Sequence, residues 1–413
     1  MRSLTRLLWL APLLLVAACG DLFGPRPGES AWRAVQLDAR LTHAYTDFGL
    51  KLFGALAAEQ PDSNLFVSPT SAAFALAMTY NGAANETQRA MAGALGVGEM
   101  TLDEVNRANA EWLAALANTQ DRKVELALAN SLWIRRGFPV HADFLERNRA
   151  FYDAEVAELD FDSPSAIGTI NGWVDRSTRG RIPTIIEEIG RDDVMFLINA
   201  LYFKADWTYQ FDKQQTRRAP FHLPDGTQRE VWMMGQKKAF PYYRGDGFGL
   251  VALPYGNGRF SMLLALPDHD RALTDLYRQL TPAALDGWIA ALEDGATMPV
   301  ALPRFTLEWE AELNDVLAAL GMEVAFDPDR ADFSAMSPAA LDAGLHISEV
   351  KQKTFLKVDE EGTEAAAVTS VKMSRVSAPP MLAFDRPFWM AIRDNATGTL
   401  LFVGQIVAPE AAS

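Results

Sequence analysis

Apolar side chains recur along this chain at spacings that distinguish helices from strands. Between residues 37 and 57 they fall every three or four positions, which predicts an amphipathic helix. Ser68 followed by Pro69 predicts a second helix start, because a serine oxygen can cap free amides and proline is tolerated in the first turn. Further helices are expected over 167–174 and 313–320, the latter stopped by Gly321. Alternating or continuously apolar runs predict strands over 124–135 and 194–203, and hairpins over 249–267 and 387–407.

The stretch "DEEGTEAAAVTSVKMSRVSAPPM", residues 359–381, is unusual because its residues alternate as in a strand while the residues at both of its ends are typical of a loop. It is too long for an ordinary connection, and such length usually indicates a function. Glu360, Glu361 and Gly362 lead into it, and Pro379 with Pro380 leads out. Its residues nevertheless alternate with period two. One face carries Thr363, Ala365, Ala367, Thr369, Val371 and Met373, and the other is more polar. Such a segment suits two locations, one exposed and one in a sheet.

Composition places the chain among globular proteins. Of its 413 residues, 49% are hydrophobic and 22% are charged, which is ample for a large core. No second linker and no internal repeat is evident, so one mixed helix and sheet domain is expected from residue 37 onward. The net charge is −15, without a basic stripe, and nucleic acid is therefore not expected as a partner.

The first residues read as an export signal. Arg2 and Arg6 precede an apolar run over 7–18, which is too short to cross a bilayer as a helix. The run ends in "LVAAC", which resembles the bacterial lipobox, so residues 1–18 are expected to be a lipoprotein signal peptide and Cys19 to carry lipid. A plain secretory signal is the alternative. Residues 19–36 then form a Gly/Pro-rich tether, and because Cys19 is the only cysteine, no intramolecular disulfide can form.

Motifs of catalysis and metal binding are missing from the sequence. The five histidines are scattered without metal-ligand spacing, and no HExxH, GxSxG, P-loop or dinucleotide fingerprint is present. The adjacent carboxylates of Glu360 and Glu361 are better explained as a charged start of the loop than as an acid/base pair. We therefore expect neither an enzyme nor a metal or other cofactor.

At this point the motifs resemble one family, the serpins. "VDEEGTEAAAVTS" is similar to the serpin hinge, and "FVSPTSAAFALAMTYNGA", "INGWVDRSTRGRIPTII", "LINALYFKADWTYQF", "FDRPFWMAI" and "LFVGQIVAP" match further serpin segments in order and spacing. The resemblance implies an α+β serpin fold over 37–413: a single mixed domain with a large central sheet, smaller sheets, several helices and an exposed reactive loop at about 360–380. It also implies an inhibitor that is cut as a substrate and then inserts its loop into the main sheet.

The resemblance assigns roles to individual positions. The hinge, where insertion begins, would comprise Glu360, Gly362, Thr363, Ala365, Ala366, Ala367 and Thr369. Small side chains there would let the strand slip into the sheet. Ser68, Ser71 and Asn199 match the shutter, where the strands part, and Trp207 matches the breach at the top of the sheet. Many serpins have histidine at the shutter position that is Gln352 here; glutamine can also donate and accept hydrogen bonds, but a pH response through that position is in doubt.

Two spacings of the family, counted from Glu360 and from Pro387, place the scissile bond between Val376 and Ser377. Valine suits a shallow apolar pocket, so an elastase-like or subtilisin-like serine protease is the expected partner. Arg375 remains open as the alternative and would suit a trypsin-like target. A serpin that does not inhibit, acting as a carrier or chaperone, is the rival interpretation. We expect a monomer held by lipid at Cys19 on the cell envelope, at the outer membrane or cell surface, since Gly20 rather than aspartate follows the cysteine.

Overall fold

The computed structural model describes residues 32–119, 121–293, 296–363 and 381–410, and the structural statements below concern these residues. One sheet has six strands. Their order is β10 (Phe305–Glu312), β11 (Lys351–Val358), β12 (Gly362–Thr363), β4 (Met195–Asp206), β2 (Val124–Arg135) and β3 (Glu155–Leu159). Only β2 and β3 are parallel neighbours in this sheet.

A second, curled sheet contains the other strands. Its path is β1 (Leu65–Val67), β15 (Leu400–Ile406), β14 (Phe388–Asp394), β8 (Phe260–Pro267), β7 (Phe248–Tyr255), β6 (Gln228–Arg244), β9 (Ala296–Pro303) and β13 (Leu382–Ala383), with β5 (Arg217–His222) paired to β6. The smaller sheets expected from the sequence are continuous with one another through the long β6, because one end of it pairs with β7 while the rest pairs with β5 and β9.

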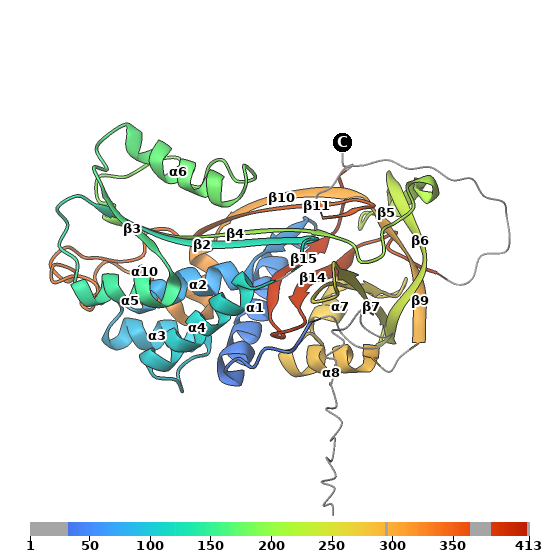
Figure 1. Cartoon of the computed structure of the whole chain (residues 1–413), viewed down its shortest axis with the longest axis horizontal. Helices are drawn as coiled ribbons and strands as arrows, with labels where there is room; N and C mark the ends of the chain where they lie inside the picture. Colours follow the sequence, from blue (N-terminus) through green and yellow to red (C-terminus); the bar gives the residue numbers. More distant parts are fainter. Residues whose placement is uncertain (1–31, 120, 294–295, 364–380, 411–413) are drawn as a thin grey trace, which may run out of the picture.

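Helices cover both faces of the six-stranded sheet (Figure 1). α6 (Ser165–Ser177) lies on one face, and α2 (Pro69–Tyr80) and α4 (Leu102–Ala117) lie on the other. The remaining helices are α1 (Ala39–Glu59), α3 (Asn85–Leu95), α5 (Ala142–Tyr152), α7 (Leu273–Tyr277), α8 (Pro282–Glu293), α9 (Asn314–Leu317) and α10 (Glu323–Phe326), with short turns η1 (Lys213–Gln215) and η2 (Ala318–Met322).

Local sequence explains the helix that lies beneath the sheet. The Ser68 side chain accepts a hydrogen bond from the Ser71 amide at 3.1 Å, and Pro69 occupies the first turn of α2. Both features confirm the helix start expected from the sequence. Almost all of α2 is buried, so it forms a rigid apolar floor under β4.

Most elements expected from the sequence are confirmed: α1, α2, α6, strands β2 and β4, and the hairpins β7–β8 and β14–β15. The helix expected over 313–320 is shorter. α9 ends at Leu317, and a π-type turn follows that is broken at Gly321, whose φ of 105° is accessible mainly to glycine. In the described part of the chain, no helix is long and apolar enough to span a membrane.

Candidate functional site: the hinge and the opening of the sheet

The chain reverses direction where the hinge begins. After β11, the amide of Asp359 donates to the carbonyl of Gly362 at 3.0 Å, which closes a tight turn. The Asp359 carboxylate accepts hydrogen bonds from the amides of Glu361 and Gly362 and fixes that turn. Thr363 then pairs with Val358 on β11 and with Ala205 on β4. The first residues of the hinge are therefore already a strand between β11 and β4.

Gly362 is required by the close approach of β4. A Cβ atom at this position would lie 2.1 Å from the carbonyl oxygen of Ala205 and 2.5 Å from the Cα of Asp206. Both atoms belong to the backbone, so neither can move aside cheaply. Glycine is thus the residue that permits the chain to enter the sheet here.

Thr363 is buried, with 1% of its surface exposed. Its hydroxyl lies 2.9 Å from the hydroxyl of Tyr255, which satisfies both polar groups in the core. The Tyr255 ring in turn stacks on Trp207, with 4.3 Å between ring centroids and planes 10° apart. Trp207, the expected breach residue, therefore contacts Thr363 through Tyr255, and its backbone amide also donates directly to the carbonyl of Glu361 at 2.8 Å.

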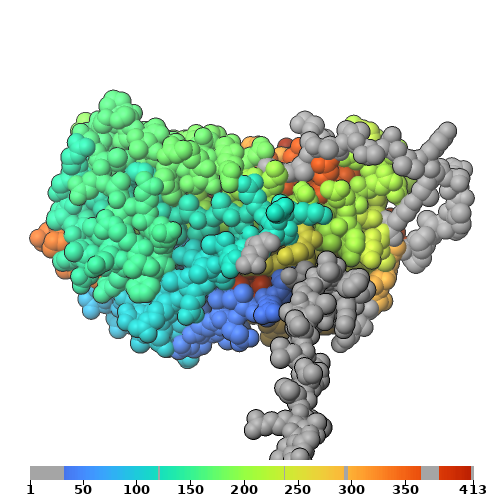
Figure 2. Space-filling model, in the orientation of Figure 1, coloured from blue at the N-terminus to red at the C-terminus, as the bar shows by residue number. Residues whose placement is uncertain are grey.

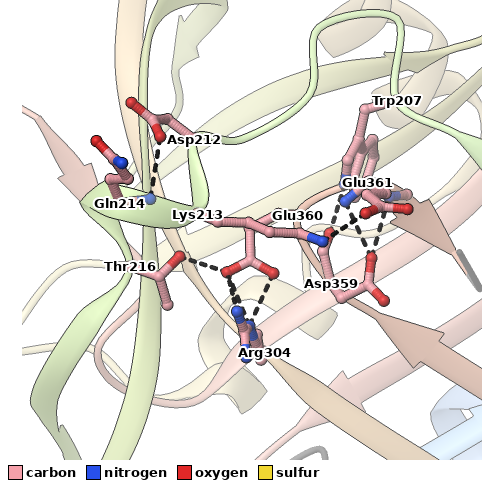
Figure 3. Close-up of polar contacts among 10 residues, drawn as sticks. Trp207, Asp212, Lys213, Gln214, Thr216, Arg304, Asp359, Glu360 and Glu361 are labelled. Atoms are coloured by element: carbon pink, nitrogen blue, oxygen red, sulfur yellow. Dashed lines mark hydrogen bonds and ion pairs between the residues drawn. The ribbon is translucent and has the colours of Figure 1, made fainter. Parts of the chain in front are cut away.

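The turn at the start of the hinge is held by two ion pairs and a tryptophan (Figure 3). Arg304 donates from Nε to both carboxylate oxygens of Glu360 at 2.8 Å, and the Thr216 hydroxyl donates to the same carboxylate. Lys213 pairs with Glu361. The indole Nε1 of Trp207 donates to the carbonyl of Asp359 at 2.9 Å. We call the set Glu360, Arg304 and Thr216 the latch.

Burial and hydrogen bonding shift the pKa values of Asp359 and Glu360, the two most buried carboxylates of this turn, in opposite directions. Burial would raise the pKa of Glu360, but hydrogen bonds from Arg304 and Thr216 outweigh it and hold the pKa below its ordinary value. For Asp359, burial dominates over the two backbone hydrogen bonds, and its pKa is raised. The structure gives Glu360 and Glu361 cationic partners, in keeping with a structural role at the start of the loop.

A cavity of about 1000 Å³ lies between β4 and β11, beyond the point where β12 ends. Its walls include residues 195–201 and 351–354, and Ser68, Ala72 and Leu76 contribute to its α2 side. Among the described residues, β11 and β4 are not paired with each other at any position. Within the described ranges, the strand position directly in line with Thr363 is therefore not occupied.

The expected shutter residues line this cavity and are brought together by the structure. The Gln352 side chain accepts from the amide of Ser68 at 2.8 Å and donates to its carbonyl at 3.0 Å. The Ser71 hydroxyl donates to the carbonyl of Asn199, and the Asn199 amide donates to Asn130 at 2.7 Å. Gln352 thus both donates and accepts. The buried Oδ1 of Asn199 has no hydrogen-bond partner in the part of the chain that the structure covers.

Several expected site residues lie outside the described residues: Ala365, Ala366, Ala367, Thr369, Arg375, Val376, Ser377 and Cys19. Their roles stay predictions. The latch partners Arg304 and Thr216 were missed by the sequence analysis, since an ion pair spanning 56 positions leaves no local pattern. Tyr255 was missed because an aromatic residue at the end of an apolar strand is usual and carries no sign of a contact with Thr363. Asn130 had a usable signal, since it and Ser131 are the two polar residues within the apolar run 126–134 of β2.

The arrangement is suited to receiving a strand. It offers a cavity between β4 and β11, a register already set by the pairing of Thr363, and the hydrogen-bonding side chains of Gln352 and Asn199 at the shutter. No cluster of three or more potential metal-ligating side chains occurs within the described ranges.

Comparisons with known proteins agree with this geometry. The family model described as "Serpin (serine protease inhibitor)" matches residues 43–409. The chain is 36% identical to human leukocyte elastase inhibitor over 383 residues, covering 90% of this chain and all of that protein. The thermophilic serpin tengpin in its native state has a TM-score of 0.79 at 32% identity, covering 91% of this chain and 96% of the other. Thyroxine-binding globulin in complex with thyroxine has a TM-score of 0.78 at 27% identity, covering 89% and 99%.

Proposed function

The chain belongs to the serpin family, and on that premise we propose that it inhibits a serine protease as a suicide substrate. The protease would cut the loop that follows Thr363 and form an acyl bond to it. The loop would then fill the vacant strand position and carry the bound enzyme along the sheet. Distortion of the enzyme's active site would halt the reaction, because deacylation depends on the geometry of the oxyanion hole.

The observation that carries this proposal is the pairing of Gly362 and Thr363 between β11 and β4. It supplies the nucleus of the inserted strand and sets its register. Continuing that register by six residues along each strand would place Thr369 opposite Gln352 on one side and Asn199 on the other. Its side chain would share the inward face of Thr363. The threonine hydroxyl would then arrive beside the unpartnered Oδ1 of Asn199.

The free energy of insertion is large enough for this role. A strand of roughly a dozen residues gains about 1 kcal/mol for each net hydrogen bond, plus the burial of its apolar face, for a total on the order of ten or more kcal/mol. The hinge sequence favours insertion, since residues 363–369 contain no proline and no bulky side chain, and Glu364 is the one charge among them.

For the target we propose an elastase-like or subtilisin-like protease, cutting between Val376 and Ser377. The apolar side chain of valine and the resemblance to leukocyte elastase inhibitor support this choice. A trypsin-like enzyme cutting after Arg375 is the competing assignment. A carrier role is the other alternative, and it draws support from the similarity to thyroxine-binding globulin.

A panel of serine proteases separates these functions. The full chain is incubated with elastase-like, subtilisin-like and trypsin-like enzymes, and the products are examined on denaturing gels and by mass spectrometry of the released peptide. An inhibitor gives a complex that survives SDS. Cleavage by every enzyme without any such complex would reject inhibition and favour the carrier.

We also propose that Cys19 carries lipid and holds the protein on the cell envelope, at the outer membrane or cell surface. The run ending in "LVAAC" and the tether after it support this proposal. Cells expressing the wild type or Cys19→Ser are fractionated into membrane and soluble material. The wild type should sediment with membranes and the variant should not; equal solubility of the two would reject the anchor.

A further inference from the structure

The cavity in the six-stranded sheet is crossed by the segment 178–194, which joins α6 to β4 and which we call the strap. Ile182, Ile185 and Ile186 of the strap line the cavity. These side chains also pack into the apolar cluster formed with Trp173 and Ile198. Figure 2 shows the green part of the chain, which includes α6 and the strap, on the outer surface of the molecule. The strap is therefore placed over the position that an inserted strand would take.

On the side of α6 the strap is held by a partly buried attachment of three hydrogen bonds. The Asn171 side chain accepts hydrogen bonds from the amides of Ile185 and Ile186 at 2.9 and 3.0 Å, and donates to the carbonyl of Ile186 at 2.8 Å. Arg179, at the start of the strap, forms an ion pair with Glu125 of β2 at 2.6 Å. All these partners lie on the β4 side of the cavity, so these contacts do not span it.

On the side of β11 the strap makes contacts of a different kind. The guanidinium of Arg181 lies over the ring of Phe355, 5.2 Å from its centroid. Glu187 lies 4.0 Å from Lys353, at the limit of an ion pair. Phe355 and Lys353 alternate with the buried residues of β11 and so lie on its outer face. These contacts do span the cavity, from the strap to β11.

A strand that fills the cavity must hold β4 and β11 two strand spacings apart along its whole length, as β12 already does at its short end. Contacts that join the strap to both walls oppose that separation. We propose that the Arg181–Phe355 contact is a clasp that sets the rate at which the sheet accepts a strand. The strap pivots on its Asn171 attachment and releases from β11. The inference rests on the proposed function only in requiring that a strand can enter the cavity.

Uptake of a free peptide tests the clasp without any protease. A synthetic peptide with the sequence of residues 364–374, which would continue the strand after Thr363, is incubated with the full chain at several temperatures, and the peptide-bound form is followed over time by native gel electrophoresis. Arg181→Ala should take up the peptide about two- to five-fold faster than wild type, the change expected from losing one exposed cation–π contact in the closed state. Phe355→Leu should act alike, and the double variant should be no faster than either single variant.

The matched control is Arg179→Ala, which removes the same kind of side chain from the same strap but leaves its link to β11 intact. Its uptake rate should equal that of wild type. Equal acceleration by Arg179→Ala and Arg181→Ala, or no acceleration by Arg181→Ala, would overturn the clasp. Failure of every variant to take up peptide would overturn it as well. Clasp-dependent uptake in a protein that traps no protease would instead uphold the clasp and reject inhibition.

Discussion

Arg304 donates hydrogen bonds to both carboxylate oxygens of Glu360, with its Nε 2.8 Å from each. The Glu360 side chain is 2% exposed, whereas that of Arg304 is 28% exposed. A buried carboxylate depends on its partner far more than an exposed one does. The pair ties the end of β9 to the turn from which the hinge enters the sheet.

Arg304→Ala should lower the free energy of unfolding by about 2–4 kcal/mol, somewhat less than for a fully buried pair because water can reach the Arg304 side. Urea denaturation followed by circular dichroism measures the change. Arg278→Ala is the matched control, since Arg278 is 74% exposed and pairs with Asp275 on the surface, where an ion pair contributes at most about 1 kcal/mol. Equal stability of the two variants would contradict the latch.

The latch should also weaken in acid. The pKa of Glu360 in the folded protein lies below its ordinary value of 4.5, so its stabilising effect is complete above that value and is lost as the pH falls through the folded pKa. The stability difference between wild type and Glu360→Gln should therefore be constant near pH 7 and shrink below about pH 4. Using this difference removes the opposite contribution of Asp359, whose pKa is raised. A difference that is unchanged between pH 7 and pH 3 would show that the Glu360 charge is not involved.

Gly362→Ala should expel the first hinge residues from the sheet, because the new methyl group would overlap the backbone of Ala205. Loss of β12 would expose the turn, and a glutamate-specific protease should then cut after Glu361 many times faster. Gly93→Ala is the control: it lies within α3, the added Cβ would meet no heavy atom within 4 Å apart from its chain neighbours and the backbone of its own helix, and alanine favours helix. Equal cleavage of both variants would mean that Gly362 does not gate the hinge.

Blocking the leading end of the strand should turn the inhibitor into a substrate. Thr363→Arg places an unpaired charge in the core beside Tyr255, at a cost of several kcal/mol, and Ala365→Pro removes a backbone donor. Both variants should still be cleaved while forming no SDS-stable complex. Thr363→Ser keeps the hydroxyl at small size and should inhibit like wild type. Insertion would be refuted by a Thr363→Arg variant that traps the protease with wild-type efficiency.

Val376→Arg should shift inhibition from elastase-like toward trypsin-like enzymes, since the residue before the cut fills the specificity pocket. The ratio of association rates for the two enzyme classes measures the shift. With the wild type, mass spectrometry should find a released peptide that spans residues 377–413 and begins at Ser377. A peptide from the stable complex that begins at Val376 would instead identify Arg375 as the residue before the cut.

The sequence predicted helices and strands well where the spacing of apolar residues alone determines them. β2 spans the same residues, 124–135, as its sequence pattern predicted, although its burial does not alternate: residues 130–134 are buried in succession because both faces of the sheet are covered there. The shutter positions were found through the family motif, and Gln352 does donate and accept as its chemistry allows. Arg304 and Phe355 could not be assigned, since their partners come from distant segments and only the packed sheet brings them together.

The short strand β12 has a consequence for the length of the loop that follows it. If the loop inserts as proposed, Gly362 and Thr363 set the register of the inserted strand, and deleting one residue after them would turn every later side chain to the opposite face of the sheet. Deleting two residues would preserve the register and bring the scissile bond about 7 Å closer to the hinge. We therefore expect the length of the loop after Thr363 to differ between related chains by even numbers of residues.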